Sequence, residues 1–260
     1  MKYSICIELL FCEESFNKRL IKTAQSCFEY FEFWTWAGKD LELIKKLSIE
    51  NNIKLASFSG DDMFSMISSK ESEEYYNYFL RSIEIAKYLD CENLVIHSDA
   101  IVNWNAKELN ENLSYEEKLF NSVKMMKRMA IIAEKEKINL QYEMLNSTVD
   151  HKNYFNNDIK TAAKMIKEVS SERAKILFDV YHVQIMQGNI INNIKNNIDL
   201  IGYIHIGDVP GRNEPGTGEL NFYNILEAIN SLGYKGFIGF ELSPKDNSDK
   251  AINAIKKILI

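Results

Sequence analysis

Four short apolar runs in the second half of the chain each end on, or close to, a side chain that can bind a cation or move a proton. Those side chains are Glu143, Asp179, His205 and Glu241. Three carboxylates and one imidazole suit a hard or borderline divalent cation. Carboxylate-rich sites accept Mg²⁺, Mn²⁺ or Co²⁺, so the residue types predict one divalent metal ion of open identity.

Strand and helix patterns alternate along the whole chain, which is typical of an α/β fold. The expected strands are 3–10, 30–34, 53–59, 93–97, 138–143, 174–179, 201–206 and 237–242. The expected helices are 15–27, 40–47, 73–89, 114–137, 159–169, 190–198, 222–232 and one from 249 onward. Eight alternations in 260 residues without a linker predict a single (β/α)8 TIM barrel over 1–260.

The predicted barrel explains how the four candidate ligands meet. Residues at the C-terminal ends of barrel strands line the active site, and the last four strands are neighbours in a closed barrel. Each residue alone has an ordinary structural explanation, such as a cap or a satisfied core histidine. Carboxylates that point into one cavity repel each other unless a cation or protons compensate, which favours the joint metal site.

Three further residues are predicted to contact a substrate. His182 lies just beyond Asp179, where its ring can reach a substrate oxygen, although a hydrogen bond within the helix start is the alternative. Arg212 lies in a loop rich in Gly and Pro, 210–218. The guanidinium fork suits a carboxylate or a pair of hydroxyls, although a plain surface arginine is the competing account. His97 ends the strand 93–97 on the same rim and is expected to line the pocket.

Other residues near the rim carry weaker signals. Glu8 and Glu32 also fall at strand ends and are expected to line the pocket or to support the ligands. Trp34, Trp36 and Trp104 are candidates for an apolar wall, although core packing is the ordinary explanation for aromatic residues. His151 lies in a polar loop, and the sequence assigns it no role.

Bulk composition limits the partners. A formal net charge of -6 leaves no broad basic surface for nucleic acid, and no apolar stretch approaches the roughly 18 residues of a membrane span. The 4 cysteines include no CxxC pair and are expected to be reduced thiols. We expect a cytoplasmic protein whose partner is a small-molecule substrate.

The chain resembles the xylose-isomerase-like barrels of the sugar isomerase/epimerase superfamily, and among them the hydroxypyruvate isomerase family. The stretches that carry the resemblance are 143–146, 178–189 and 205–221. The resemblance implies a metal held by Glu143, Asp179, His205 and Glu241, with Glu143 and Glu241 also serving as the acid/base pair. It implies that His182 and Arg212 hold the substrate. By analogy with this superfamily, the chain is also a possible homo-oligomer.

The activity implied by the resemblance is the isomerisation of hydroxypyruvate to tartronate semialdehyde, or of a related 2-oxo sugar acid, through an enediolate. A ketose 3-epimerase or another sugar isomerase is the alternative. His205 is more typical of epimerases and of isomerases for larger oxo-acid sugars, whereas Val149 stands where ketose 3-epimerases have a second glutamate.

Two other classes are weaker alternatives. A hydrolase like endonuclease four needs many histidines, and this chain has 4. A non-catalytic metabolite-binding barrel predicts the loss of an acid/base residue, yet Glu143 and Glu241 are both present.

Overall fold

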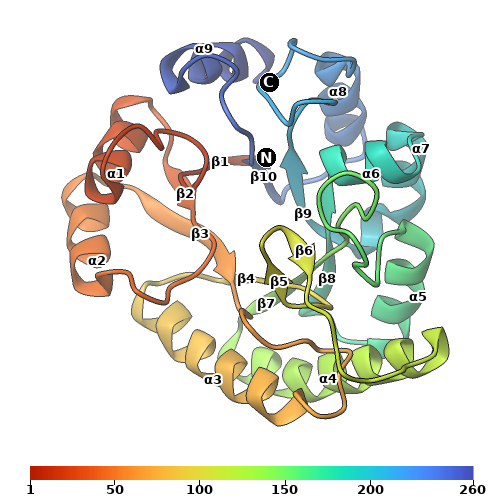
Figure 1. Cartoon of the computed structure of the whole chain (residues 1–260). Helices are drawn as coiled ribbons and strands as arrows, with labels where there is room; N and C mark the ends of the chain where they lie inside the picture. The colour runs from red at the N-terminus through yellow and green to blue at the C-terminus, as the bar shows by residue number, and fades with distance from the viewer. Residues whose placement is uncertain (260) are drawn as a thin grey trace.

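Eight parallel strands close into a barrel in the computed structural model, which describes residues 1–259 (Figure 1). The strands are β1 (Lys2–Cys6), β2 (Tyr30–Glu32), β3 (Lys54–Ser59), β4 (Asn93–Ile96), β7 (Asn139–Glu143), β8 (Ala174–Asp179), β9 (Ile201–Ile206) and β10 (Phe237–Phe240). They follow one another around the barrel in chain order, and β10 closes the ring against β1. The predicted (β/α)8 TIM barrel is therefore confirmed.

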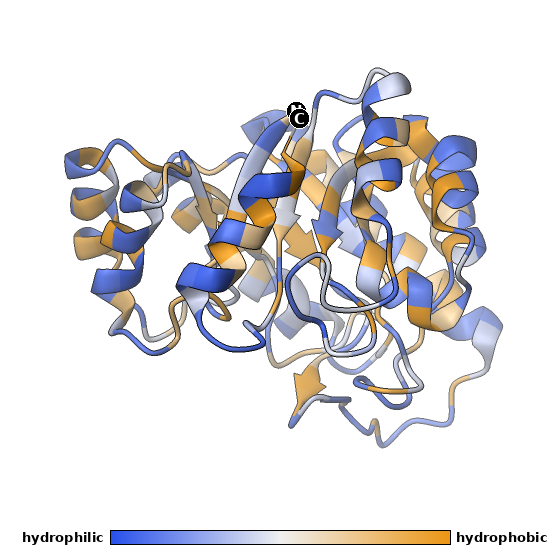
Figure 2. Cartoon of the chain, turned by 90° about the horizontal axis from the view of Figure 1, so that it is seen from above, coloured by the Kyte–Doolittle hydropathy of each residue, from blue (hydrophilic) through white to orange (hydrophobic). Residues whose placement is uncertain are grey.

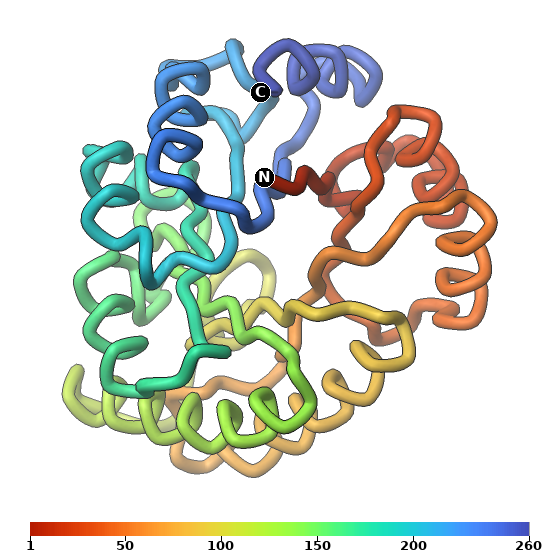
Figure 3. The backbone as a smooth tube through the Cα atoms, turned by 180° about the vertical axis from the view of Figure 1, so that it is seen from behind, coloured from red at the N-terminus to blue at the C-terminus, as the bar shows by residue number. Residues whose placement is uncertain are grey.

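The helices surround this ring of strands, as the views from the two ends show (Figures 1 and 3). They are α1 (Phe16–Gln25), α2 (Leu41–Glu50), α3 (Ser72–Tyr88), α4 (Tyr115–Glu136), α5 (Ile159–Val169), α6 (Val180–Met186), α7 (Ile190–Asn197), α8 (Phe222–Ser231) and α9 (Ser248–Ile258), with the 3-10 turn η1 (Ile198–Leu200) after α7. Each helix has apolar and polar residues, which Figure 2 shows as orange and blue bands. Their buried residues belong largely to one core with the strands.

The longest helix, α4, begins where the sequence predicts. The hydroxyl of Ser114 accepts a hydrogen bond from the backbone N–H of Glu117 at 3.2 Å, and the carboxylate of Glu117 accepts one from the backbone N–H of Ser114 at 2.8 Å. This reciprocal pair satisfies two of the free donors at the helix start. Met126 and Met129 lie on the buried face of α4, so they serve as core residues.

The first strand is shorter than predicted. β1 ends at Cys6, whereas the apolar pattern predicted a strand over 3–10. The backbone N–H of Leu10 donates to the carbonyl oxygen of Cys6 at 3.0 Å, so the chain turns there instead of extending. Leu10 and Phe11 are nevertheless buried, which explains why their apolar character resembled a strand.

Two short elements near the mouth of the barrel were not predicted. The chain forms a hairpin after β4, made of β5 (Ile101–Val102) and β6 (Asn105–Ala106), and α6 follows β8 directly. The hairpin turn holds Asn103 and Trp104 at φ of 49° and 67°. In Figure 1 the hairpin lies in front of the strand ends β4, β7 and β8. It therefore places Trp104 near the active-site end of the barrel.

No helix within residues 1–259 combines the length and apolar character required to cross a bilayer. The cytoplasmic location and the homo-oligomer stay predictions.

Candidate metal and substrate site

The structure brings the four candidate ligands together. Glu143 and Asp179 are the last residues of β7 and β8, His205 lies in β9, and Glu241 follows β10 directly. The register pairs Asp179 with His205 on adjacent strands. One ligand atom from each of the four side chains lies within 4.8 Å of the others, and all four residues are buried. The expected convergence at the C-terminal ends of the strands is therefore present.

The polar atoms at this point fit a divalent metal. Oε1 of Glu143 and Nδ1 of His205 are buried without a hydrogen-bond partner, and they lie 3.8 Å apart. Nδ1 of His205 lies 3.2 Å from Oε2 of Glu241. Buried acceptor atoms that face one another need a cation or a proton between them. A metal ion at their centre would satisfy both atoms, and Asp179 would supply the fourth ligand.

Glu32 fixes the orientation of the His205 ring. Nε2 of His205 lies 2.8 Å from Oε2 of Glu32, whose other oxygen accepts hydrogen bonds from the hydroxyls of Ser4 and Tyr203. The Glu32 carboxylate accepts three such bonds and has no proton to donate. A neutral His205 ring must therefore carry its proton on Nε2, the nitrogen that faces Glu32. The lone pair then lies on Nδ1, which faces the other candidate ligands. Glu32 thus has the supporting role that its strand-end position predicted.

Glycine at position 239 makes this contact possible. A Cβ at Gly239 would lie 2.2 Å from Oε1 of Glu32 and 2.8 Å from Cδ2 of His205. Any larger residue would displace one of the two side chains.

Arg212 lies against the candidate ligands themselves. Its Nη2 donates to Oδ2 of Asp179 at 3.1 Å and to Oε2 of Glu241 at 2.5 Å. Burial raises the pKa of Asp179 to about 7, whereas the guanidinium of Arg212 opposes the effect of burial on Glu241, whose pKa is lowered to about 2. The predicted substrate arginine is therefore within the site, where it partly balances the carboxylates.

His97 links Glu143 to a carboxylate that the sequence analysis did not identify. Nδ1 of His97 lies 3.0 Å from Oδ1 of Asp61, and Nε2 lies 3.1 Å from Oε2 of Glu143. Although burial opposes the charged form, the carboxylates of Asp61 and Glu143 raise the pKa of His97 to about 10. Both ring nitrogens then carry protons and donate. His97 lines the cavity as predicted, and its contact with substrate stays a prediction.

His182 presents one free N–H to the site. Its Nδ1 accepts hydrogen bonds from the backbone N–H of Asn146 at 3.2 Å and from the Asn146 side-chain amide at 2.8 Å. The proton of the neutral ring is therefore on Nε2, which has no hydrogen-bond partner and lies 3.6 Å from Oδ2 of Asp179. Asp179 also caps α6, since its Oδ1 accepts from the backbone N–H of Tyr181 at 2.8 Å. This cap places His182 beside the candidate ligands.

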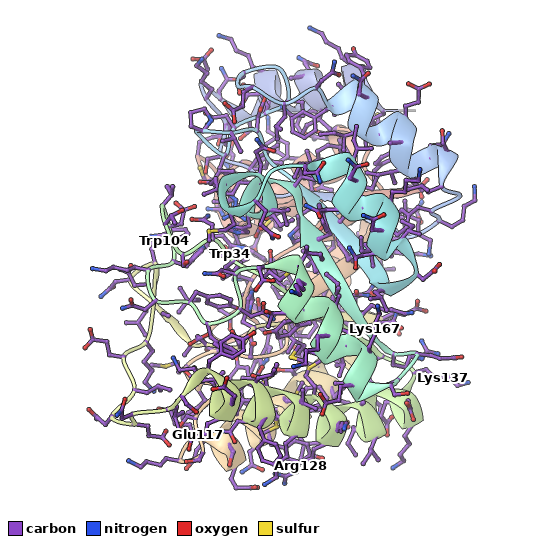
Figure 4. All side chains as sticks on the ribbon, turned by 90° about the vertical axis from the view of Figure 1, so that its right-hand side faces the viewer. Trp34, Trp104, Glu117, Arg128, Lys137 and Lys167 are labelled. Carbon is purple, nitrogen blue, oxygen red and sulfur yellow. The ribbon has the colours of Figure 1, made fainter. Side chains whose placement is uncertain are left out.

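A cavity of about 380 Å³ opens over these residues. Trp34 and Trp104 form one side of it, with their rings edge to face at 5.7 Å, and Figure 4 shows them next to each other. The indole N–H of Trp34 donates to Oε1 of Glu241 at 2.6 Å, so Trp34 also orients that carboxylate. Cavities of this size suit small molecules.

Asp61 and this role of Trp34 were missed from the sequence. The available signal for Asp61 was its position two residues after the end of β3, on the same rim as the other strand ends.

The chain is similar to proteins named as isomerases. It is 26% identical over 261 residues to the hydroxypyruvate isomerase of Escherichia coli K12, a match that covers 97% of both chains. It is 24% identical to a 2-oxo-tetronate isomerase of Haemophilus influenzae, over 98% of both chains. A putative hydroxypyruvate isomerase of Xenopus laevis is 38% identical over 118 residues, which cover 45% of this chain and 43% of that protein. These matches confirm the resemblance to hydroxypyruvate isomerases.

Solved structures share the fold. An AP endonuclease of family 2 from Brucella melitensis superposes with a TM-score of 0.89 at 22% identity, over 98% of both chains. A D-psicose 3-epimerase from Clostridium cellulolyticum H10 superposes with a TM-score of 0.84 at 17% identity, over 99% of this chain and 98% of that one. The family model described as xylose isomerase-like TIM barrel matches residues 21–258. The chain therefore belongs to the xylose isomerase-like TIM barrel family.

Proposed function

We propose that the protein is a metal-dependent isomerase of a small oxo-acid, which converts hydroxypyruvate to tartronate semialdehyde or acts on a related 2-oxo sugar acid. The observation that carries the proposal is the pair Glu143 and Glu241, whose carboxylates both approach Nδ1 of His205, at 3.8 Å and 3.2 Å. The pair thus lies at the candidate metal position and beside the cavity. The names of the full-length relatives support the same reaction class.

The two glutamates are held so that each can transfer a proton. His97 binds Oε2 of Glu143 at 3.1 Å. Trp34 donates to Oε1 of Glu241 at 2.6 Å. In the proposed reaction one glutamate removes the proton from the hydroxyl-bearing carbon, and the other delivers a proton to the neighbouring carbon. The hydroxyl proton passes to the former carbonyl oxygen, which completes the isomerisation.

A divalent ion held by Glu143, Asp179, His205 and Glu241 would polarise the substrate carbonyl and acidify the adjacent C–H bond. Mg, Mn and Co all suit these ligands. We infer that residues 1–260 act as one catalytic domain, since the candidate ligands and the residues around them come from strands on all sides of one barrel.

The test is an isomerisation assay on metal-stripped protein, with and without Mn²⁺, Mg²⁺ or Co²⁺. The substrates are hydroxypyruvate, a 2-oxo-tetronate and a panel of ketoses, with products identified by NMR. Metal-dependent conversion of an oxo-acid is the expected result. Turnover of ketoses alone, with inversion at C3, would favour the epimerase alternative. A protein that binds metal and converts none of these compounds would contradict the proposal.

A further inference from the structure

Apart from the hydroxyl of Ser57, the buried polar atoms without partners on the residues that line the cavity fall into two chemical groups. Glu143 and His205 contribute acceptors at the candidate metal position, as described above. The other group consists of nitrogens: Nδ1 of His151, Nε2 of His182 and Nε of Arg212. A buried nitrogen without a partner is costly, so this second group points to a ligand that supplies acceptors.

The nitrogens come from neighbouring side chains. The rings of His151 and His182 lie 5.4 Å apart between centroids, and both residues are more than nine-tenths buried, with exposures of 5% and 1%. Burial and, after it, the charge of Arg212 lower the pKa of both histidines, which agrees with a position close to the guanidinium. The group therefore occupies one corner of the cavity beside Asp179.

Asn146 holds both histidines in place. Its backbone and side-chain N–H groups bind Nδ1 of His182, as described above. Its carbonyl oxygen accepts a hydrogen bond from the backbone N–H of His151 at 3.1 Å. Its side-chain oxygen accepts from the backbone N–H groups of Val149 and Asp150, each at 3.0 Å. The loop that carries His151 is thus tied to the same residue that orients His182.

Each of the three unpartnered nitrogens can donate a hydrogen bond. Nε of Arg212 always carries a proton, and Nε2 of His182 carries one because Nδ1 accepts from Asn146. The neutral ring of His151 can place its single proton on Nδ1. A carboxylate only accepts hydrogen bonds, whereas a hydroxyl must also donate. Donors without a partner on three side chains that line the same cavity therefore match a carboxylate better than a sugar hydroxyl.

We propose that His151 is a specificity-determining residue, which with His182 and Arg212 binds the carboxylate of an oxo-acid substrate. This inference rests on the proposed function and assigns a role to a residue that the sequence analysis left without one. It predicts that His151 discriminates hydroxypyruvate from dihydroxyacetone, which has a neutral hydroxymethyl group in place of the carboxylate.

The test compares two variants of the metal-loaded full chain. His151→Phe keeps a ring against Trp104 and His182 but removes the donor, whereas His151→Asn keeps an amide N–H near the position of Nδ1. A hydrogen bond to a charged group contributes enough to change KM for hydroxypyruvate by about 10-fold or more. We expect that increase in His151→Phe, an unchanged KM for dihydroxyacetone, and recovery of most of the loss in His151→Asn.

A binding measurement tests the inference without turnover. Calorimetry of the metal-loaded protein should show that D-glycerate binds more tightly than glycerol, and that His151→Phe weakens only D-glycerate binding. Equal effects on the acidic and the neutral compound, or no preference of the unmodified protein for D-glycerate, would overturn the role of His151. Failure of the unmodified protein to isomerise any substrate would instead contradict the proposed function, and the binding comparison would still decide the role of His151.

Discussion

Nε2 of His205 lies 2.8 Å from Oε2 of Glu32, a contact between β9 and β2, which are not neighbours in the barrel. The contact crosses the barrel interior and leaves Nδ1 of His205 facing Glu143 and Glu241. The carboxylate at position 32 therefore decides which ring nitrogen is available to a metal.

Glu32→Gln should weaken metal binding by about 10- to 100-fold, a usual effect of losing the partner that orients a histidine ligand. The N–H of the Gln amide would face Nε2 of His205 and favour the ring form with its proton on Nδ1. A protonated Nδ1 has no lone pair with which to bind the metal. Calorimetric titration with Mn²⁺ measures the change. Glu8→Gln is the matched control, because Glu8 lies on the same rim but pairs with Lys39 at 2.6 Å. Equal affinities in Glu32→Gln and the unmodified protein would contradict the prediction.

Metal should also stabilise the fold, since Glu143, Asp179 and Glu241 hold three carboxylates close together. At a free metal concentration about 100 times Kd, binding to the folded state alone adds about 2.7 kcal/mol to the free energy of unfolding. For a chain of this size the melting temperature should rise by about 5 to 10 °C. Thermal melts with EDTA and with Mn²⁺ measure the shift, and Asp179→Asn should reduce it. An identical melting temperature with and without Mn²⁺ would argue against the site.

The last four strands and their terminal residues could be predicted because local sequence carries that information. Each is an apolar run long enough to recognise, and Glu143, Asp179 and Glu241 stand at the point where the run stops. Parallel strands in chain order then place their C-terminal ends together. The prediction needed no knowledge of which side chains touch.

Contacts across the barrel interior could not be predicted in the same way. Whether Glu32 reaches His205, or Asp61 reaches His97, depends on the stagger of the strands and on the space left by Gly239. The hairpin of β5 and β6 has two residues in each strand, too few for a periodic pattern. The sequence therefore predicted which candidate residues converge at the ends of the strands, but it missed Asp61 and Trp34, which contact His97 and Glu241.

Asp61 should act on the reaction through His97. Its Oδ1 binds Nδ1 of His97, and its Oδ2 accepts from the hydroxyl of Tyr75 at 2.9 Å, so the carboxylate is fixed on both sides. Asp61→Asn should lower kcat by up to about 100-fold through misplacement of Glu143, with little change in KM. Steady-state kinetics at saturating metal measure both constants. Asp62→Asn is the neighbouring control, and a similar loss in that variant would indicate a general effect of charge.

The two glutamates can be distinguished by isotope exchange. Replacement of the glutamate that removes the substrate proton should abolish both turnover and exchange of that proton with solvent. Replacement of the glutamate that delivers the proton should abolish turnover but leave exchange. We therefore expect Glu143→Gln and Glu241→Gln each to lower kcat by about 10²-fold or more, with only one of them retaining exchange.

The measurement is NMR of hydroxypyruvate in D2O with each variant at saturating Mn²⁺, beside circular dichroism to check the fold. Glu219→Gln provides a control, because Glu219 is exposed in the loop after β9 and lies outside the residues that line the cavity. Turnover near that of the unmodified protein in Glu241→Gln would remove it from the proton-transfer pair. Both oxygens of Glu241 accept hydrogen bonds, Oε1 from the indole of Trp34 and Oε2 from Arg212, so a Gln amide can keep only one of the two bonds when the base is lost.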